Sequence, residues 1–205
     1  MIWTKQKKVL ASVATVGVLG AAAAFGVFGA FSAQTSNDNN VFTAGSVTLT
    51  DNDGGSFLYS VEDAVPGTAN PANEACIEVE YTGSVDSDVA LFTPTTALAT
   101  ADLSPYVDLE ITKGTQANPS FRSCTGFTPV GAAGDVYDGT LQSFATTHTD
   151  FASGIALTDP AGGPEWAEGD AVVYRFRATL DAAAPNTAQG DTTGLHTYTW
   201  EAQND

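Results

Sequence analysis

The side chains best suited to acid–base or metal chemistry are few in this chain. Its two histidines, His148 and His196, are far apart, and no H-E-x-x-H motif sets two of them on one helix face to hold zinc. The chain also lacks a G-x-S-x-G elbow, a phosphate-binding loop and a dinucleotide fingerprint. His148 with Asp150 is more typical of a surface turn than of a catalytic dyad. These residue types point away from an enzyme and give no cofactor site.

Two further features could bind a ligand. The run D-N-D-G-G at residues 51–55 resembles the opening of a calcium loop, but the glutamate and the spacing of an EF-hand are absent. We expect a solvated turn there and leave calcium open as an alternative. Trp166 follows a Gly-Gly-Pro break, so we expect a half-buried lid on the core, the alternative being a platform that stacks on a sugar.

The two cysteines, Cys76 and Cys124, have a chemistry that depends on the compartment. In an oxidising compartment an even number of cysteines favours a disulfide, and two free buried thiols are the alternative. Such a bond would close a loop of roughly fifty residues and contribute about 4 kcal/mol. Cys124 lies in the stretch 114–133, which has no periodicity and which we expect to be a loop attached to the rest of the domain by the disulfide. Cys76 falls on the outward side of an alternating segment, so we expect it on the solvent face or at the beginning of a strand.

The elements that must position these side chains are short β-strands. Apolar and polar residues alternate between turns rich in Gly, Pro and Asn, which predicts strands at residues 41–50, 56–61, 75–83, 88–94, 106–114, 171–182 and 194–203. One helical turn is expected within 97–103, and a short strand or helical turn within 134–144. This pattern predicts an all-β, antiparallel β-sandwich that forms a single domain over residues 41–205.

Two arginines lie on the polar side of the predicted strand 171–182. Arg175 and Arg177 are expected to pair with outward acids of a neighbouring strand. The candidate acids are Glu78, Glu80, Asp108 and Glu110.

The first forty residues have a different composition. Three lysines, at positions 5, 7 and 8, precede an uncharged and largely apolar stretch at 9–37. A basic start, an apolar centre and small residues beyond it predict a secretory signal peptide that forms an N-terminal hydrophobic helix and ends at Ala30 or Ala33, which makes it residues 1–30 or 1–33. A permanent membrane helix is the alternative. Residues 31–40 are polar and headed by one aromatic, Phe31, and on their own predict a flexible tail.

The net charge excludes several partners. The formal charge is −17, from 7 basic and 24 acidic residues. The three leading lysines are removed with the signal peptide, so 4 basic residues remain against 24 acids, which gives 4 − 24 = −20. A chain this acidic repels nucleic acid and anionic lipid headgroups. We therefore expect contact with the membrane only through the uncleaved signal segment.

The junction between these regions resembles the TasA and camelysin family. The matching features are an apolar Ala/Gly run that ends at Gly29, Ala30 and Phe31, and the run F-T-A-G-S-V-T-L at residues 42–49. The Pro66–Gly67 turn with its following strand and the final strands, which end in T-W-E-A-Q, resemble the family as well. The stretch 93–168 matches only weakly.

The resemblance implies a fold, a processing site and a mode of assembly. It narrows the sandwich to a jelly roll and implies cleavage between Ala30 and Phe31 by a dedicated signal peptidase, with Ala33 as the second choice. Family members form extracellular filaments of a biofilm matrix, in which the freed N-terminal segment inserts as a strand into the next subunit. Applied here, residues 31–40 are the donor strand, anchored by Phe31 and continuing through Ser32, Ala33, Gln34 and Thr35.

The partner would then be a second copy of the chain in a secreted, head-to-tail homopolymer, with an accessory matrix protein left open. A monomeric surface or adhesion module that binds a carbohydrate or a host protein is the alternative. Some relatives of camelysin are described as metalloproteases. The missing zinc motif gives no support for carrying that activity over to this chain.

Overall fold

The structure is a computed structural model that describes residues 43–67 and 74–204. The predictions for the signal peptide, the cleavage site at Ala30 and Phe31, and the donor segment 31–40 lie outside these residues. From Ala44 onward the described chain forms one compact unit. Its strands are β1 (Leu49–Asp51), β2 (Glu74–Tyr81), β3 (Ser87–Phe92), β4 (Val107–Thr115), β5 (Thr128–Pro129), β6 (Tyr137–Thr140), β7 (Ile155–Leu157), β8 (Glu165–Trp166), β9 (Ala171–Leu180) and β10 (Thr199–Gln203).

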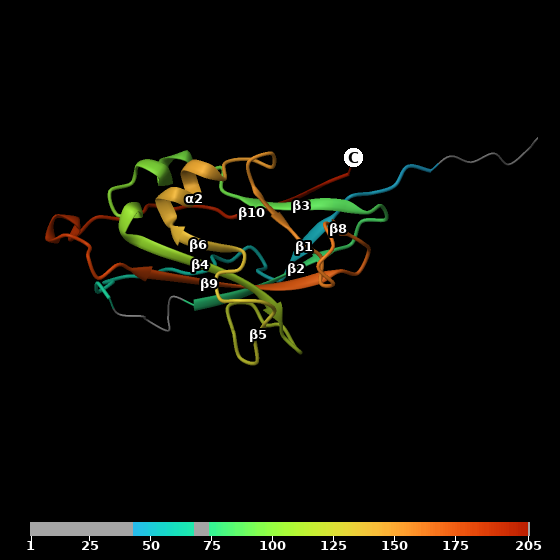
Figure 1. The fold of residues 1–205 in the computed structure, drawn as a ribbon, viewed down its shortest axis with the longest axis horizontal. Helices are drawn as coiled ribbons and strands as arrows, with labels where there is room; N and C mark the ends of the chain where they lie inside the picture. The colour runs from blue at the N-terminus through green and yellow to red at the C-terminus, as the bar shows by residue number, and fades with distance from the viewer. Residues whose placement is uncertain (1–42, 68–73, 205) are drawn as a thin grey trace, which may run out of the picture. The chain divides into compact units, whose positions relative to one another are not determined.

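All strand pairs are antiparallel and form two sheets, so the predicted β architecture is confirmed at this level. The larger sheet has the order β1-β2-β9-β4-β5, and β6 also pairs with β4. The smaller sheet has the order β10-β3-β7, and β8 also pairs with β3. In Figure 1, β3 and β10 lie in one layer and β2, β4 and β9 in the layer that faces it.

The core lies between the two sheets and follows the predicted alternation. On β9 the side chains of Val172, Tyr174 and Phe176 are buried, and on β4 those of Leu109 and Ile111. Period-two alternation sends every second side chain to one face of a strand, so both strands contribute a continuous apolar face. β9 pairs with both β2 and β4 over long registers, which makes it the centre of the larger sheet.

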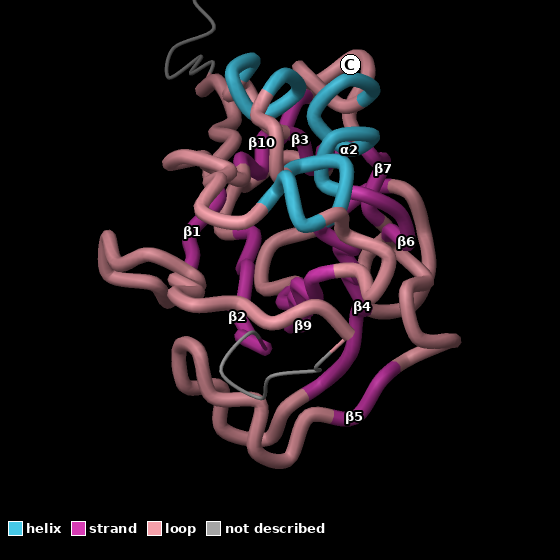
Figure 2. Tube along the Cα trace, turned by 90° about the vertical axis from the view of Figure 1, so that its left-hand side faces the viewer, coloured by secondary structure: helices cyan, strands magenta, loops and turns pink. Residues whose placement is uncertain are grey.

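Helical turns cover one end of the unit, as Figure 2 shows. The α-helix α2 (Leu141–Thr147) begins after Thr140, whose side chain accepts a hydrogen bond from the Ser143 backbone N–H and so caps the first turn. Its buried face includes Leu141 and Phe144. The 3₁₀ turns are η2 (Thr96–Thr100), η3 (Ser104–Tyr106) and η4 (Asn186–Ala188). No helix within the described residues has the length and hydrophobicity needed to span a bilayer.

Three predicted strands differ from the structure, and of segment 194–203 only Thr199–Gln203 is a strand. Of the described part of segment 41–50, residues 43–50, only the end from Leu49 is a strand, although Ser46 and Thr48 still accept main-chain hydrogen bonds from Ser84 and Thr82. Segment 56–61 pairs with none of the described strands, despite its alternation. Alternation predicts which side chains share a face, but a strand also needs a neighbouring backbone to bond with.

Candidate functional site

A gap between the edges of the two sheets is the most unusual feature of the unit. One side is segment 49–61, which includes β1, and the other is segment 192–203, which includes β10. Among the described strands β1 pairs only with β2, and β10 only with β3. Within the described residues no main-chain hydrogen bond joins the two segments. We call this gap the seam.

Three hollows lie along the seam, and Tyr198 lines two of them. The end cavity, of about 380 Å³, has segments 57–61 and 192–198 as its walls. Ala178 and Leu180 of β9, Val107 of β4 and Leu141 of α2 also line it, so it opens into one end of the sandwich interior. The edge hollow, of about 230 Å³, lies between β1 and β10.

The end cavity is free of formal charge. Although the chain has 24 acidic residues, none of the residues that line this cavity is Asp, Glu, Lys or Arg. Its rim exposes two large apolar side chains, Phe57 with 62% and Leu195 with 100% of its surface accessible. A neutral, apolar concavity with exposed apolar groups is typical of a binding site.

Side-chain hydrogen bonds from Tyr59 cross the seam. The Tyr59 hydroxyl lies 3.1 Å from Nε2 of His196 and 2.6 Å from the hydroxyl of Tyr198. Nδ1 of His196 lies 3.2 Å from the carbonyl oxygen of Gly194, which can only accept, so Nδ1 carries the proton. Nε2 then accepts from Tyr59, which in turn accepts from Tyr198.

Burial keeps this cluster neutral. It lowers the pKa of His196 and raises the pKa of Tyr59 to about 12. The pKa of Tyr198 is raised as well, mainly by burial. His196 is thus a neutral packing and hydrogen-bonding residue, as its position in the alternating segment 194–203 predicted.

The second histidine is also occupied by structural contacts. Nδ1 of His148 lies 2.8 Å from the carbonyl oxygen of Ser153, and its ring packs against Phe144 and Tyr137. Asp150 accepts hydrogen bonds from the side chain and backbone of Ser153, which lower its pKa. The expected surface turn is therefore present. The structure does not bring His148 and His196 together with a carboxylate.

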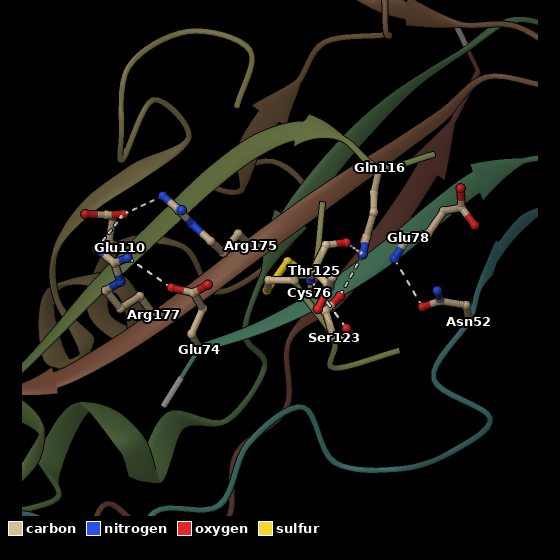
Figure 3. The surroundings of a disulfide bond; sticks show 11 residues. Asn52, Glu74, Cys76, Glu78, Glu110, Gln116, Ser123, Thr125, Arg175 and Arg177 are labelled. Atoms are coloured by element: carbon tan, nitrogen blue, oxygen red, sulfur yellow. Dashed lines mark hydrogen bonds and ion pairs between the residues drawn. A yellow bond between two sulfur atoms is a disulfide. The ribbon is translucent and has the colours of Figure 1, made fainter. Parts of the chain in front are cut away.

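The disulfide holds a loop over the outer edge of β2. Cys76 and Cys124 are bonded to each other, as favoured from the sequence. The Arg122 backbone N–H donates to the Cys76 carbonyl oxygen at 2.8 Å, and the Gln116 side chain donates to the carbonyl oxygens of Ser123 and Thr125 (Figure 3). This loop protects a strand edge that could otherwise pair with another chain. The expectation that Cys76 faces solvent is wrong, because the loop buries its outward side chain.

Ion pairs join four polar residues on the outer face of the larger sheet. Arg175 lies 3.3 Å from Glu110, and Arg177 lies 2.9 Å from Glu74 and 3.8 Å from Glu110 (Figure 3). The predicted partner Glu110 is confirmed. Glu74 was missed because the predicted strand began one residue later, at Ala75.

The two remaining basic residues of the described chain differ from this pair. Nζ of Lys113 donates to Oγ1 of Thr158 at 2.6 Å. The guanidinium of Arg122 lies over the ring of Phe57, 4.8 Å from its centre, and within the described residues it has no carboxylate partner. Arg122 is therefore an uncommitted cation beside the end cavity.

Five buried side-chain polar atoms have no hydrogen-bond partner among the described residues: Oγ of Ser104, Oε1 of Gln116, the hydroxyl of Tyr174, Nε of Arg175 and Nε1 of Trp200. Trp200 also lines the edge hollow. Trp166, by contrast, is fully buried and donates from Nε1 to the Leu157 carbonyl oxygen at 3.3 Å. Its predicted half-exposed position is wrong, and the alternative of a sugar-stacking platform fails for this residue.

No cluster of three or more metal-ligating side chains is present within residues 43–67 and 74–204. In the turn at 51–55, Asp51 accepts from the Asp53 backbone N–H at 3.0 Å, and Asp53 accepts from that of Gly55. These carboxylates thus stabilise their own turn, in keeping with the expected solvated loop.

Comparison with models of known protein families finds no match, and comparison with curated proteins finds none either.

Sequence reasoning did not find the seam. Tyr59, His196 and Tyr198 each lie on an alternating segment, which was the available signal. The two segments face each other without pairing because of contacts between residues that are far apart in the sequence. Tyr59 and His196, for example, are separated by 137 positions.

Proposed function

We propose that the protein is a secreted structural subunit of an extracellular filament or biofilm matrix, assembled by donor-strand exchange. Residues 31–40 of one copy, freed by cleavage after Ala30, enter the seam of the next copy. The observation that carries the proposal is the seam itself: two facing segments that no main-chain hydrogen bond joins within the described residues, beside an uncharged apolar cavity. The resemblance to the TasA and camelysin family supports the same assembly and a jelly-roll arrangement of the sheets.

The backbone of the seam suits strand addition. Among the described strands β10 has one neighbour, β3, so its other edge offers main-chain donors and acceptors. An added strand satisfies these groups and supplies a regular ladder, which is the basis of β-augmentation. The partnerless Nε1 of Trp200 lies on the same strand and would gain an acceptor from an inserted backbone.

The lack of charge in residues 31–37 favours this segment as the one that enters the seam. Residues 31–37 are uncharged, whereas the mature chain carries −20, so most of its surface repels a second copy. A neutral segment that enters a neutral cavity avoids this repulsion. Phe31 is the only large apolar side chain of the segment, and its burial in the end cavity would contribute about 2 kcal/mol. The contact is head-to-tail and never closes on itself, so it produces a fibre.

The test compares mature protein that begins at Phe31 with a deletion of residues 31–40. Electron microscopy and light scattering follow assembly, and circular dichroism with thermal unfolding establishes that both proteins are folded. We expect fibres from the first protein and stable monomers from the second. Phe31→Ala should weaken assembly, while Ser36→Ala, a change in the same segment, serves as the matched control. Fibres from the deleted protein would refute the proposal.

The exposed side chains of Phe57 and Leu195 also favour a second candidate, a monomeric surface module that binds another molecule through the cavity rim. Because Trp166 is buried, such a module would bind through this rim rather than through that ring. Full-length mature protein that stays monomeric at high concentration would favour this candidate.

A further inference from the structure

We infer that Arg122, stacked on Phe57, positions the incoming segment by pairing with the carboxylate of Asp38 from the second copy, an inference that rests on the proposed function. Phe57 lines the end cavity, and the Arg122 guanidinium lies 4.8 Å from the centre of its ring. Arg122 is not itself among the residues that line the cavity, so it meets the cavity through the Phe57 ring. Arg122 acts here as a positioning residue for binding.

The Arg122 backbone is held in an uncommon conformation. Its φ is +67°, in the left-handed region that favours Gly or Asn and is costly for a long side chain. Its backbone N–H is bonded to Cys76, and the disulfide at Cys124 closes the loop two residues later. The side chain is thus presented from a fixed backbone.

Arg122 is also the basic side chain that remains available in the described chain. Arg175 and Arg177 are paired with Glu110 and Glu74, and Lys113 is bonded to Thr158. A guanidinium that is stacked on a ring keeps its N–H donors free in the ring plane, where a carboxylate can accept two of them.

The distribution of acids along the seam restricts where a carboxylate can be accommodated. Asp51 and Asp53 line the edge hollow, and Glu62 and Asp63 line the hollow that continues past Val61. Phe57 lies between these two acidic regions in sequence. Among the described residues, Arg122 is therefore the cation that can attract an acid to the seam.

The proposed donor segment supplies a matching group. Residues 31–40 contain one acid, Asp38, and no basic residue. Phe31 and Asp38 are seven residues apart, which is roughly 23 Å in an extended strand. An anchor in the cavity and a carboxylate at Arg122 would together define the direction and register of the inserted strand.

A charge-swap cycle tests the pairing in mature protein that begins at Phe31. The four proteins are the wild type, Arg122→Glu, Asp38→Lys and the double variant, and the readout is the critical concentration for assembly at low and high salt. We expect each single variant to raise the critical concentration about tenfold and the double variant to restore it, because the swapped pair is again opposite in charge. High salt should reduce all of these differences.

Arg122→Asn is the control for folding, because Asn tolerates the left-handed backbone and removes only the cation. It should leave the thermal midpoint unchanged and still raise the critical concentration. The pairing is overturned if Arg122→Glu assembles as well as the wild type, or if Asp38→Lys fails to rescue it. If deletion of residues 31–40 leaves assembly unchanged, the proposed function itself fails, so the two failures are distinguishable.

Discussion

The hydroxyl of Tyr59 and Nε2 of His196 lie 3.1 Å apart, although the two residues are separated by 137 positions in the sequence. The same hydroxyl contacts that of Tyr198 at 2.6 Å. Because no main-chain hydrogen bond crosses the seam among the described residues, these side-chain bonds connect its two sides. One hydroxyl group thus links the beginning of the described chain to its end.

Tyr59→Phe should destabilise the monomer by about 1 kcal/mol, because it leaves the half-buried Tyr198 hydroxyl and Nε2 of His196 without their shared partner. The ring and its packing against His196 and Tyr198 remain. Urea unfolding of protein that lacks residues 31–40 measures the change without interference from assembly. An unchanged unfolding midpoint would show that the seam is held by ring packing alone.

Tyr174→Phe removes a hydroxyl just as Tyr59→Phe does, but we do not expect it to destabilise the protein. The Tyr174 hydroxyl is buried and has no hydrogen-bond partner among the described residues, and burial raises its pKa. Removing an unsatisfied buried polar group costs nothing in lost bonds, so stability should stay the same or rise by about 1 kcal/mol. Urea unfolding beside Tyr59→Phe provides the comparison. Equal destabilisation by both changes would contradict this account.

The strands could be predicted where apolar and polar residues alternate cleanly and the segment also pairs with neighbouring strands. Segments 106–114 and 171–182 alternate cleanly, and the structure contains β4 and β9 at these positions. The same alternation placed Arg175 on the polar face with four candidate acids, of which Glu110 is its partner, whereas the loop held by Cys124 was predicted from the lack of any period in 114–133. Alternation determines which face of a strand is buried and which is exposed, and for β4 and β9 this was sufficient to predict the strand.

The seam was not predictable because it depends on the absence of pairing between distant segments. Segment 56–61 alternates as a strand does, yet it pairs with none of the described strands. The position of Cys76 on the outward side of its strand was predicted correctly. Its burial was not, because the loop that covers it comes from Cys124, 48 positions further along the chain. Whether a loop covers an outward side chain depends on tertiary contacts, which local sequence patterns do not encode.

His196 should make the protein less stable at mildly acidic pH. Burial lowers the pKa of His196 in the folded state below its ordinary value of about 6.5, so below about pH 6.5 the unfolded chain binds the proton more readily than the folded one. The free energy of unfolding therefore falls as the pH decreases through that window. Asp51, Glu78 and Asp108 have pKa values raised mainly by burial and contribute with the opposite sign at lower pH.

His196→Gln separates these contributions, because it keeps polar atoms at this position but does not titrate. Thermal unfolding of both proteins from about pH 7.5 to about pH 5.5 should show a larger loss for the wild type. The difference between the two proteins isolates the histidine, since the carboxylates are common to both. Parallel curves for the two proteins would rule out the histidine as the source.

Removing the disulfide should both destabilise the fold and expose an edge. The bond joins residues 48 positions apart, so Cys76→Ala with Cys124→Ala should lower the free energy of unfolding by about 4 kcal/mol. The loop should then release the Cys76 carbonyl oxygen, which accepts from the Arg122 backbone N–H. An uncovered edge of β2 can pair with other chains, so we expect irregular aggregates rather than fibres. Urea unfolding measures the first effect and electron microscopy the second.

Reduction of the wild type provides the matched control for the disulfide. Dithiothreitol should lower the wild-type unfolding midpoint to that of the double variant and leave the double variant unchanged. This comparison separates loss of the bond from loss of the side chains, because the reduced protein retains both cysteines. A double variant that unfolds at the wild-type midpoint would mean that the hydrogen bonds of Gln116 and Arg122 hold the loop without the covalent link.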